Sequence, residues 1–487
     1  MVRNGALGTN AVKLTISKFI ALTISLVSSM LLSRFRSLEE YGTYSQLIIL
    51  TNIATTIIMM GLPNSINYFL SKAETNEERD HFLSVYYTSS TLLSLIAGIT
   101  LCACVRVWVN YFENPLIQTY LYFLAIYPWT KIICQSVENL LVVYGKSTLI
   151  MVYRISNSAC LLAIILIVKI FDFNFDFYLL LFVCVESIFS LWVYILAKSV
   201  SRKLTVLIDW KLIKSILEFS LPIGIASMIG TINIELDKIV IGGFLNTEQM
   251  AIYTNASKEM PVTIIATSIT AVLMPKMVQL IKKKEYKNAV DIWKTANTLS
   301  FEAICFLAFA LICFAPEVID LLYSSKYLPG VSVFRVYSLV LVFRSTYYGM
   351  MLNATGKTKY ILYSSLFSLG LNVLLNYLFF LLFGMIGPAI ATFLATGFIQ
   401  IIQLIASSKV LKVKFSYIFP WKNMFLSILI NLVLCVAFLK IKEYISLEII
   451  VGNTIEAIIL GIIWALVLLL IRKKVIIHNW SLLNEQS

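Results

Sequence analysis

The chain has 487 residues, of which 59% are apolar and 13% charged, and its formal net charge is +13. Because a soluble domain carries roughly 25% charged residues, this composition excludes an ordinary water-soluble protein. The basic residues lie in short segments between apolar runs, a pattern that encodes membrane topology and argues against nucleic acid as a partner. The sequence therefore predicts an all-α polytopic membrane protein.

Fourteen segments are long and apolar enough to cross the hydrocarbon core, which takes about 20 helical residues. The first seven predicted spans are 10–33, 44–70, 82–106, 116–143, 148–170, 176–199 and 214–243. The other seven are 250–277, 292–314, 330–353, 358–383, 385–408, 423–441 and 452–471. The first run, 11–32, is too long for the apolar region of a signal peptide, so we expect no cleavage there.

The segments between successive spans are alternately rich and poor in lysine and arginine. If both termini are cytoplasmic, cytoplasmic segments and helix ends hold 26 of them, Arg472 included, and the opposite side holds 7. An incorrect number of spans would scramble this alternation. The distribution therefore supports fourteen spans with both termini in the cytoplasm.

The chain also repeats itself weakly. EYGTYS at 40–45 resembles QMAIYT at 249–254, Leu62-Pro63 resembles Met274-Pro275, and GKS at 145–147 resembles GKT at 356–358, with offsets of 209 to 212 residues. These matches predict a six-helix lobe at 1–203, a second at 204–411, and appended helices with a short tail at 412–487. An even number of spans inserts both lobes in the same sense, around a pseudo-twofold axis along the membrane normal. That architecture predicts a cavity between the lobes and alternating access.

Patterns typical of enzymes and cofactors are missing from the sequence. The Gly-Lys-Ser and Gly-Lys-Thr pieces lack the earlier glycine of a phosphate-binding loop, so they are interpreted as tight turns between helices. All eight cysteines lie in apolar runs and are interpreted as small hydrophobic residues. We therefore predict a transporter rather than an enzyme, with no cofactor and no metal site.

Charged residues inside the predicted spans are the candidates for function, because each costs about 2.5–3.5 kcal/mol at the bilayer centre. Lys131 and Arg344 lie 14 and 12 residues before the corresponding glycines Gly145 and Gly356, at similar depths on equivalent helices. Opposite walls of one cavity would bring two cations together, which favours an anion such as a diphosphate between them. The alternative is that each cation pairs with an acid such as Glu138 or Glu302. The further candidates for a cationic, substrate-binding cavity are Arg154, Lys18, Lys258 and Arg335.

A second group of charges is predicted to bind a coupling ion or to act in gating. Glu235 and Lys238 are three residues apart and share a helix face, so a local ion pair is the simpler interpretation. Asp237 lies about 100° round the same helix and could instead bind a proton or a cation. Lys258 and its neighbour Glu259 point in different directions, so one of them is expected to line the cavity.

Several segments in order resemble the polysaccharide flippases that export O-antigen and capsule repeat units, a branch of the MATE-like superfamily. The similar segments are EYGTYS (40–45), FSLP (219–222), ELDKIVIG (235–242), AIY (251–253), GKT (356–358), LNVLLN (371–376) and FGMIGPAIAT (383–392). The resemblance implies a V-shaped, two-lobed bundle in the bacterial cytoplasmic (inner) membrane. It further implies that undecaprenyl-diphosphate-linked oligosaccharides are moved from the cytoplasmic to the outer leaflet for surface polysaccharide biosynthesis.

The same resemblance implies membrane lipids as partners, together with coupling to H⁺ or Na⁺ and a polymerase of the same polysaccharide pathway. Three alternatives remain. A lipid II flippase and a MATE-type cation-coupled drug exporter share the scaffold, although drug exporters usually have twelve spans and an acidic cavity. A membrane glycolipid enzyme or scaffold is the third.

Overall fold

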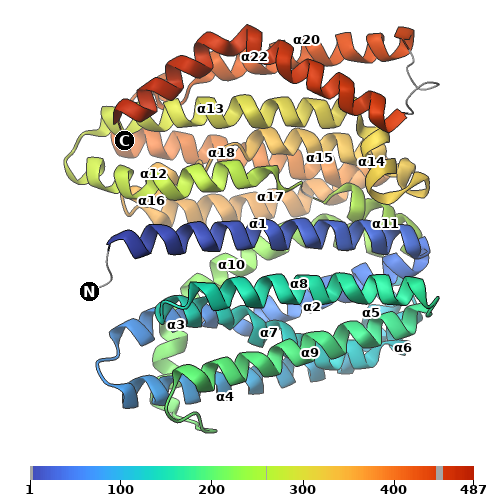
Figure 1. Cartoon of the computed structure of the whole chain (residues 1–487), viewed down its shortest axis with the longest axis vertical. Coiled ribbons are helices and arrows are strands. Elements are labelled where there is room, and N and C mark those ends of the chain that lie inside the picture. The colour runs from blue at the N-terminus through green and yellow to red at the C-terminus, as the bar shows by residue number, and fades with distance from the viewer. Residues whose placement is uncertain (1–3, 259, 446–452, 487) are drawn as a thin grey trace. The chain divides into compact units, whose positions relative to one another are not determined.

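The computed structural model describes residues 4–258, 260–445 and 453–486. It forms two compact units, residues 1–251 and 252–487. The helices of the first unit are α1 (Asn4–Phe35), α2 (Leu38–Met59), α3 (Leu62–Lys72), α4 (Asn76–Ala103), α5 (Val105–Phe112), α6 (Leu116–Thr119), α7 (Leu121–Val143), α8 (Ser147–Ile170), α9 (Phe175–Val200) and α10 (Trp210–Phe244). Within this unit α1 packs against α8, and α7 packs against α4 and α9 (Figure 1).

Helix α11 (Thr247–Ala256) contains the boundary between the units. The second unit continues with η1 (Pro261–Thr263), α12 (Ile264–Lys282), α13 (Tyr286–Cys313), α14 (Ala315–Tyr323), η2 (Ser325–Gly330), α15 (Val331–Phe343), α16 (Met350–Ala354), α17 (Thr358–Phe383), η3 (Gly384–Ile386), α18 (Gly387–Leu411), α19 (Phe415–Ile418), α20 (Trp421–Ile445) and α22 (Asn453–Gln486). Helix α13 is central, since it packs against α12, α15, α20 and α22.

The described helices confirm an all-α membrane fold. Twelve segments are long and apolar enough to cross a membrane, and one of them, 358–411, contains the two helices α17 and α18. Helix α7, which corresponds to the predicted span 116–143, is not among the twelve, and it carries Lys131 and Glu138. The number fourteen therefore stays a prediction, as does the three-part division of the chain. Helix α10, assigned by the sequence to the second lobe, packs with α2 and α3 in the first unit.

Several predicted spans are not single helices, among them 44–70, which is interrupted between α2 and α3. Two other interruptions concern the candidate residues. The segment 250–277 is interrupted between α11 and η1, just before Pro261, which has no N–H to continue a helix. The segment 330–353 is interrupted between α15 and α16, at residues 344–349. Both interruptions carry charged residues that the sequence had singled out, Lys258 in the first and Arg344 in the second.

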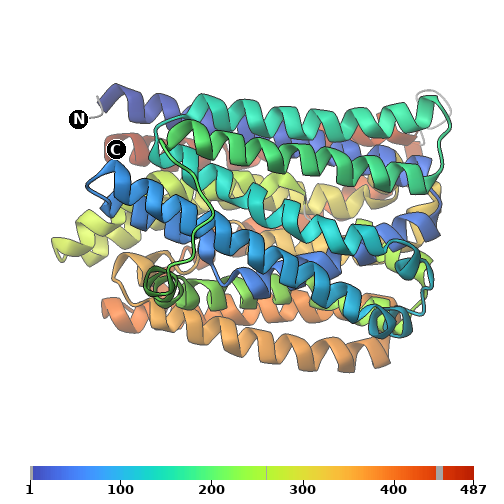
Figure 2. The same ribbon diagram turned by 90° about the horizontal axis from the view of Figure 1, so that it is seen from below.

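An extended segment, 201–209, joins α9 to α10 and lies along α4 (Figure 2). The backbone N–H groups of Thr205 and Leu207 donate to the hydroxyls of Ser84 and Thr88, each at 3.1 Å. The segment ends at Asp209, whose carboxylate accepts from the first N–H groups of α10. Together with the His81 ring at 3.0 Å, these backbone donors, led by that of Leu212, lower the pKa of Asp209. The start of α10 is thus fixed to the first unit.

Two glycines allow α10 to approach the turn between α2 and α3. Gly61 adopts φ +75°, and a Cβ atom on Gly224 would lie 2.2 Å from the carbonyl carbon of Met60. Gly224 follows Pro222, which removes a backbone donor inside the same helix. The contact therefore depends on the absence of a side chain at position 224.

Replacing Gly224 with alanine is expected to destabilise the protein by about 1–3 kcal/mol, because backbone atoms of the α2–α3 turn occupy the space of the new methyl group. Gly230 on the same helix is the matched control, since a Cβ there meets no atom within 4 Å. Thermal unfolding in detergent micelles measures both variants. An unchanged melting temperature for Gly224→Ala would show that the two segments do not approach this closely.

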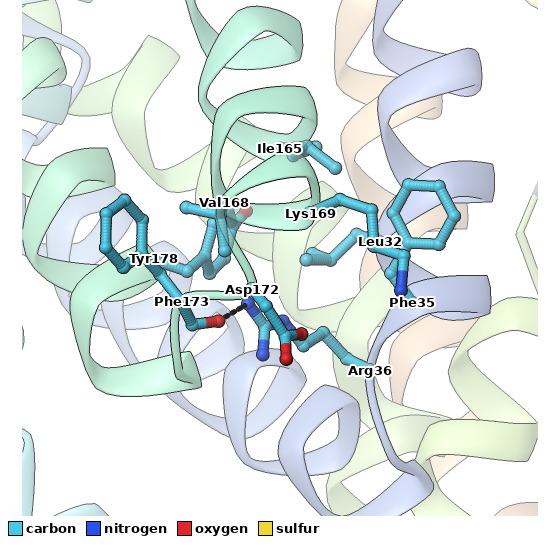
Figure 3. A pocket seen from close by; sticks show the side chains of 9 residues that line it. All are labelled: Leu32, Phe35, Arg36, Ile165, Val168, Lys169, Asp172, Phe173 and Tyr178. Atoms are coloured by element: carbon cyan, nitrogen blue, oxygen red, sulfur yellow. Dashed lines mark hydrogen bonds between the residues drawn. The ribbon is translucent and has the colours of Figure 1, made fainter.

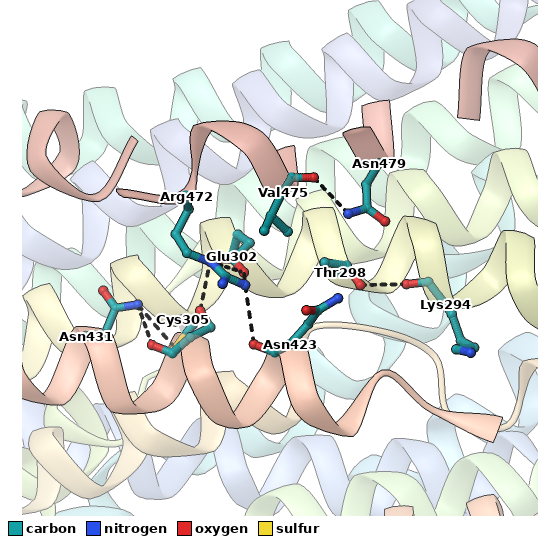
Figure 4. A network of polar contacts seen from close by, with 10 residues as sticks. Lys294, Thr298, Glu302, Cys305, Asn423, Asn431, Arg472, Val475 and Asn479 are labelled. Atoms are coloured by element: carbon teal, nitrogen blue, oxygen red, sulfur yellow. Dashed lines mark hydrogen bonds and ion pairs between the residues drawn. The ribbon is translucent and has the colours of Figure 1, made fainter. Parts of the chain in front are cut away.

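The second unit holds its last two helices through a buried ion pair. Arg472 on α22 donates to Glu302 on α13, with its Nε at 3.0 Å from the carboxylate, and both residues are 5% exposed (Figure 4). Ser427 on α20 donates to the other carboxylate oxygen at 3.0 Å. The sequence analysis counted Arg472 among the cytoplasmic loop charges. In the structure Arg472 lies inside α22, which continues beyond the predicted end of the span at 471, and its cytoplasmic side stays a prediction.

Candidate functional site

In the first unit, a hydrogen-bonded network joins three helices at Asn52 on α2. The Lys131 ammonium on α7 donates to the side-chain carbonyl of Asn52. The Asn52 amide donates in turn to Glu235 on α10 at 3.0 Å, and Lys238 Nζ lies 2.8 Å from the other oxygen of that carboxylate. The local pair of Glu235 and Lys238 is therefore present, and Asn52 connects it to Lys131.

More charges surround this network. Glu186 on α9 is buried, and its charge and that of Glu235 both act on Lys131. The Asn157 amide on α8 lies 3.4 Å from the Glu186 carboxylate. Arg154 on α8 pairs with Glu138 on α7, so the acid that the sequence offered to Lys131 is taken by Arg154. The charges that act on Lys131 are thus the carboxylates Glu235 and Glu186, while Arg154 and Glu138 form a pair of their own.

Among the candidate gating residues that the structure describes, Asp237 is the most buried, at 1% exposure. One of its carboxylate oxygens accepts from the backbone N–H of Lys238 at 2.8 Å. Lys18, by contrast, is exposed on α1. A role of Asp237 in ion coupling and a role of Lys18 in substrate binding stay predictions.

In the second unit, Arg344 lies at a hollow of about 650 Å³ formed by α12, α18 and the interruption between α15 and α16. Most of its lining surface is apolar, but polar groups are distributed over it: threonines of α12 and η1, tyrosines 347 and 348 of the interruption, and glutamines 400 and 403 of α18. Non-helical backbone inside a membrane span is tolerated where it lines a cavity or is buried in protein. Arg344 therefore lies on an interrupted helix beside a hollow that combines apolar surface with hydroxyl and amide groups, and transporters use interrupted helices for substrate sites.

Side chains of neighbouring helices hold this interruption in place. The Gln400 amide on α18 donates to the carbonyl of Phe343, and the Ser300 hydroxyl on α13 donates to the carbonyl of Ser345. The Thr346 hydroxyl donates to the side chain of Asn297 on α13. These bonds satisfy backbone groups that the missing helical turn leaves free. The segment 344–349 is thus a fixed part of the fold.

Arg335 and Lys258 lie elsewhere on the described chain. Arg335 is exposed on α15, nine residues before Arg344, and its Nε donates to the carbonyl of Ile312 at 3.3 Å. Lys258 lies in the interruption between α11 and η1, and Glu259 lies outside the described residues. Lys131 and Arg344 belong to different units, so a shared anion site between them stays a prediction.

A small hollow in the first unit lies between the end of α1, the end of α8 and the loop that follows α8 (Figure 3). Arg36 Nη2 donates to the carbonyl of Phe173 at 2.8 Å, and Lys169 Nζ lies 5.4 Å from the centre of the Phe35 ring. The space, about 30 Å³, accommodates one water molecule and not a transported lipid. These cations therefore stabilise the end of the helix pair.

Sequence reasoning missed the neutral residues of both sites. Asn52, Asn157, Asn297 and Gln400 are amides within apolar spans, and each bonds to a charged residue or to a residue at the interruption between α15 and α16. An amide in a span is costly unless it finds a partner, so a search extended from charges to amides would have found them.

The helical architecture defines a multi-pass α-helical membrane protein. Residues 31–332 match the polysaccharide biosynthesis protein family, and the chain belongs to this family. It is similar to a curated protein of Haloferax volcanii described as a probable low-salt glycan biosynthesis flippase, Agl15. The identity is 21% over 212 residues, which is 43% of this chain and 45% of the relative.

Solved structures share the fold. The inward closed conformation of the lipid II flippase MurJ matches with a TM-score of 0.77 and 16% identity, over 95% of this chain and 99% of MurJ. An inward-facing multidrug resistance MATE family transporter matches with a TM-score of 0.66 and 16% identity, over 83% and 98%. A transporter from Pyrococcus furiosus, whose description reports a binding pocket of reverse polarity, matches at 0.56 and 14%, over 84% and 95%. The predicted MATE-like fold is therefore confirmed.

Proposed function

We propose that this protein is a flippase that moves undecaprenyl-diphosphate-linked oligosaccharide repeat units from the cytoplasmic to the outer leaflet. Membership of the polysaccharide biosynthesis family supports a glycan pathway, and the flippase activity ascribed to the Haloferax relative supports lipid-linked glycan as the cargo. The single observation that carries the proposal is Arg344 on an interrupted helix beside a hollow with hydroxyl and amide groups, because this combination provides for both a charged and a hydroxylated part of a cargo.

The role proposed for each of the two sites follows from its chemistry. Arg344 binds the diphosphate, since a guanidinium offers paired donors to phosphate oxygens. The network of Lys131, Asn52, Glu235 and Lys238 changes its hydrogen bonds when a proton or cation arrives. Asp237, adjacent to that network in sequence, is the further candidate for a coupling ion. Alternating access of the two units then exposes the cargo to one leaflet at a time.

Deletion of the gene in its native host tests the assignment. We expect loss of the surface polysaccharide and accumulation of its lipid-linked precursor in the cytoplasmic leaflet, because synthesis of the precursor does not depend on export. Lysis with accumulation of lipid II would instead identify a lipid II flippase. Sensitivity to drugs with normal surface polymer would identify an exporter.

A further inference from the structure

The hollow of the second unit presents oxygen atoms whose protons are already engaged. The Thr267 hydroxyl donates to the carbonyl of Ile264 at 3.0 Å, and the Thr270 hydroxyl donates to the carbonyl of Ala266 at 2.8 Å. A hydroxyl has one proton and two lone pairs, so a hydroxyl that donates to its own helix still accepts from a ligand. Both threonines line the hollow from α12, together with Thr263 one turn earlier.

Gln400 adds a further acceptor on the facing helix. It lines the hollow, is 9% exposed, and uses its amide N–H₂ group to hold the carbonyl of Phe343. Its side-chain oxygen has no hydrogen-bond partner within the described ranges. A buried amide oxygen without a partner is costly, so a donor from a ligand would stabilise it.

Thr267, Thr270 and Gln400 form one wall of the hollow. The electrostatic character of this wall distinguishes between the parts of a lipid-linked glycan. Lone pairs of hydroxyl and amide oxygens repel an anion, and they accept hydrogen bonds from the hydroxyl groups of a sugar. The guanidinium of Arg344, at the same hollow, has only donors and favours an anion. The wall and the arginine therefore suit different chemical groups that lie next to each other in a glycosyl diphosphate.

We propose that the hollow is the saccharide subsite, in which Thr267, Thr270 and Gln400 accept hydrogen bonds from the hydroxyls of the sugar next to the diphosphate. Tyr347 in the interrupted segment offers an aromatic ring for the apolar face of the sugar. A volume of about 650 Å³ lies within the 300–1,000 Å³ range that is typical of ligand pockets. This inference rests on the proposed function and adds to it the residues that bind the sugar.

The test compares the binding of two lipids to the purified full-length protein in detergent. One is the lipid-linked glycan accumulated by the deletion strain, and the other is undecaprenyl diphosphate without sugar. The wild type is expected to bind the glycosylated lipid more tightly. The double variant Thr267→Val/Thr270→Val keeps the side-chain shape and removes both oxygens. It is expected to lose about tenfold in affinity for the glycosylated lipid, with no change for the bare lipid.

Controls separate this inference from the proposed function. Ser268→Ala removes a hydroxyl from the same helix, but Ser268 lines a different hollow with residues of α13 and α22, so both affinities are expected to stay unchanged. Arg344→Ala is expected to weaken the binding of both lipids. Equal affinity of the wild type for the two lipids, or an equal loss for both in the double variant, would overturn the saccharide subsite and leave the flippase proposal standing. Failure of the wild type to bind either lipid would overturn both proposals.

Discussion

Replacement of Arg344 or Lys131 with alanine is expected to abolish export of the surface polysaccharide while the protein still inserts into the membrane. Loss of the Arg344 guanidinium removes the donors that bind the diphosphate, at a cost of about 10- to 100-fold in affinity for a charge-assisted hydrogen bond. Loss of the Lys131 ammonium removes the cation on which Glu235 and Glu186 act. Export is measured as surface polymer per cell, and insertion as protein in the membrane fraction.

Two further variants sharpen this prediction. Lys357→Ala removes an exposed cation from the turn before α17 in the same unit, and it is expected to leave export unchanged. Arg344→Lys keeps the charge but loses the planar fork of donors, so partial export is expected. Normal surface polymer in both alanine variants would exclude an essential role for these two cations.

The second large effect is expected at the ion pair that joins α13 to α22. Glu302→Gln leaves the Arg472 charge buried without its carboxylate, and Arg472→Met leaves the carboxylate without its cation. Each single variant is expected to lose about 3–5 kcal/mol of stability. The loss appears as a lower melting temperature in detergent micelles. The change is a loss of stability because both residues are buried, so water cannot solvate the charge that remains after its partner is removed.

A double-mutant cycle distinguishes the ion pair from simple packing. Glu302→Gln/Arg472→Met removes both charges, and it is expected to lose less stability than the sum of the two single changes. Lys473→Ala, at the exposed neighbour of Arg472, is the control and is expected to have little effect. Additive losses in the double variant would show that the two charges do not stabilise each other.

Hydropathy and loop charge predicted most of the fold because they report directly on the membrane environment. Helices α8, α9 and α17 begin and end within about two residues of the predicted spans, as expected where an apolar run stops at a polar turn. The interruption between α15 and α16 was not predicted, since a window average does not register six residues of mixed polarity. The sequence Ser345-Thr346-Tyr347-Tyr348-Gly349 is the local signal for it.

The candidate sites were less predictable, because partners come from helices far apart in the sequence. The pairing of Glu235 with Lys238 was foreseeable from their spacing of three residues. The pairing of Glu302 with Arg472 joins residues 170 positions apart, and no periodicity reveals it. Similarly, the repeat related Lys131 to Arg344 by depth, but one lies in a hydrogen-bonded network and the other beside hydroxyl groups. The equivalent depth of the two residues stays a prediction, and the weak internal symmetry did not predict their chemical environments.

Transport of a lipid-linked oligosaccharide by the purified protein in vesicles is the most direct test of the account. The glycolipid accumulated by the deletion strain is placed in both leaflets, and a membrane-impermeant glycosidase is added outside. With the wild-type protein, the enzyme is expected to digest the pool in the inner leaflet as well, because flipping renews the outer supply, and Arg344→Ala is expected to protect that pool. Protection of half the glycolipid in wild-type vesicles, as in vesicles without protein, would contradict the assignment.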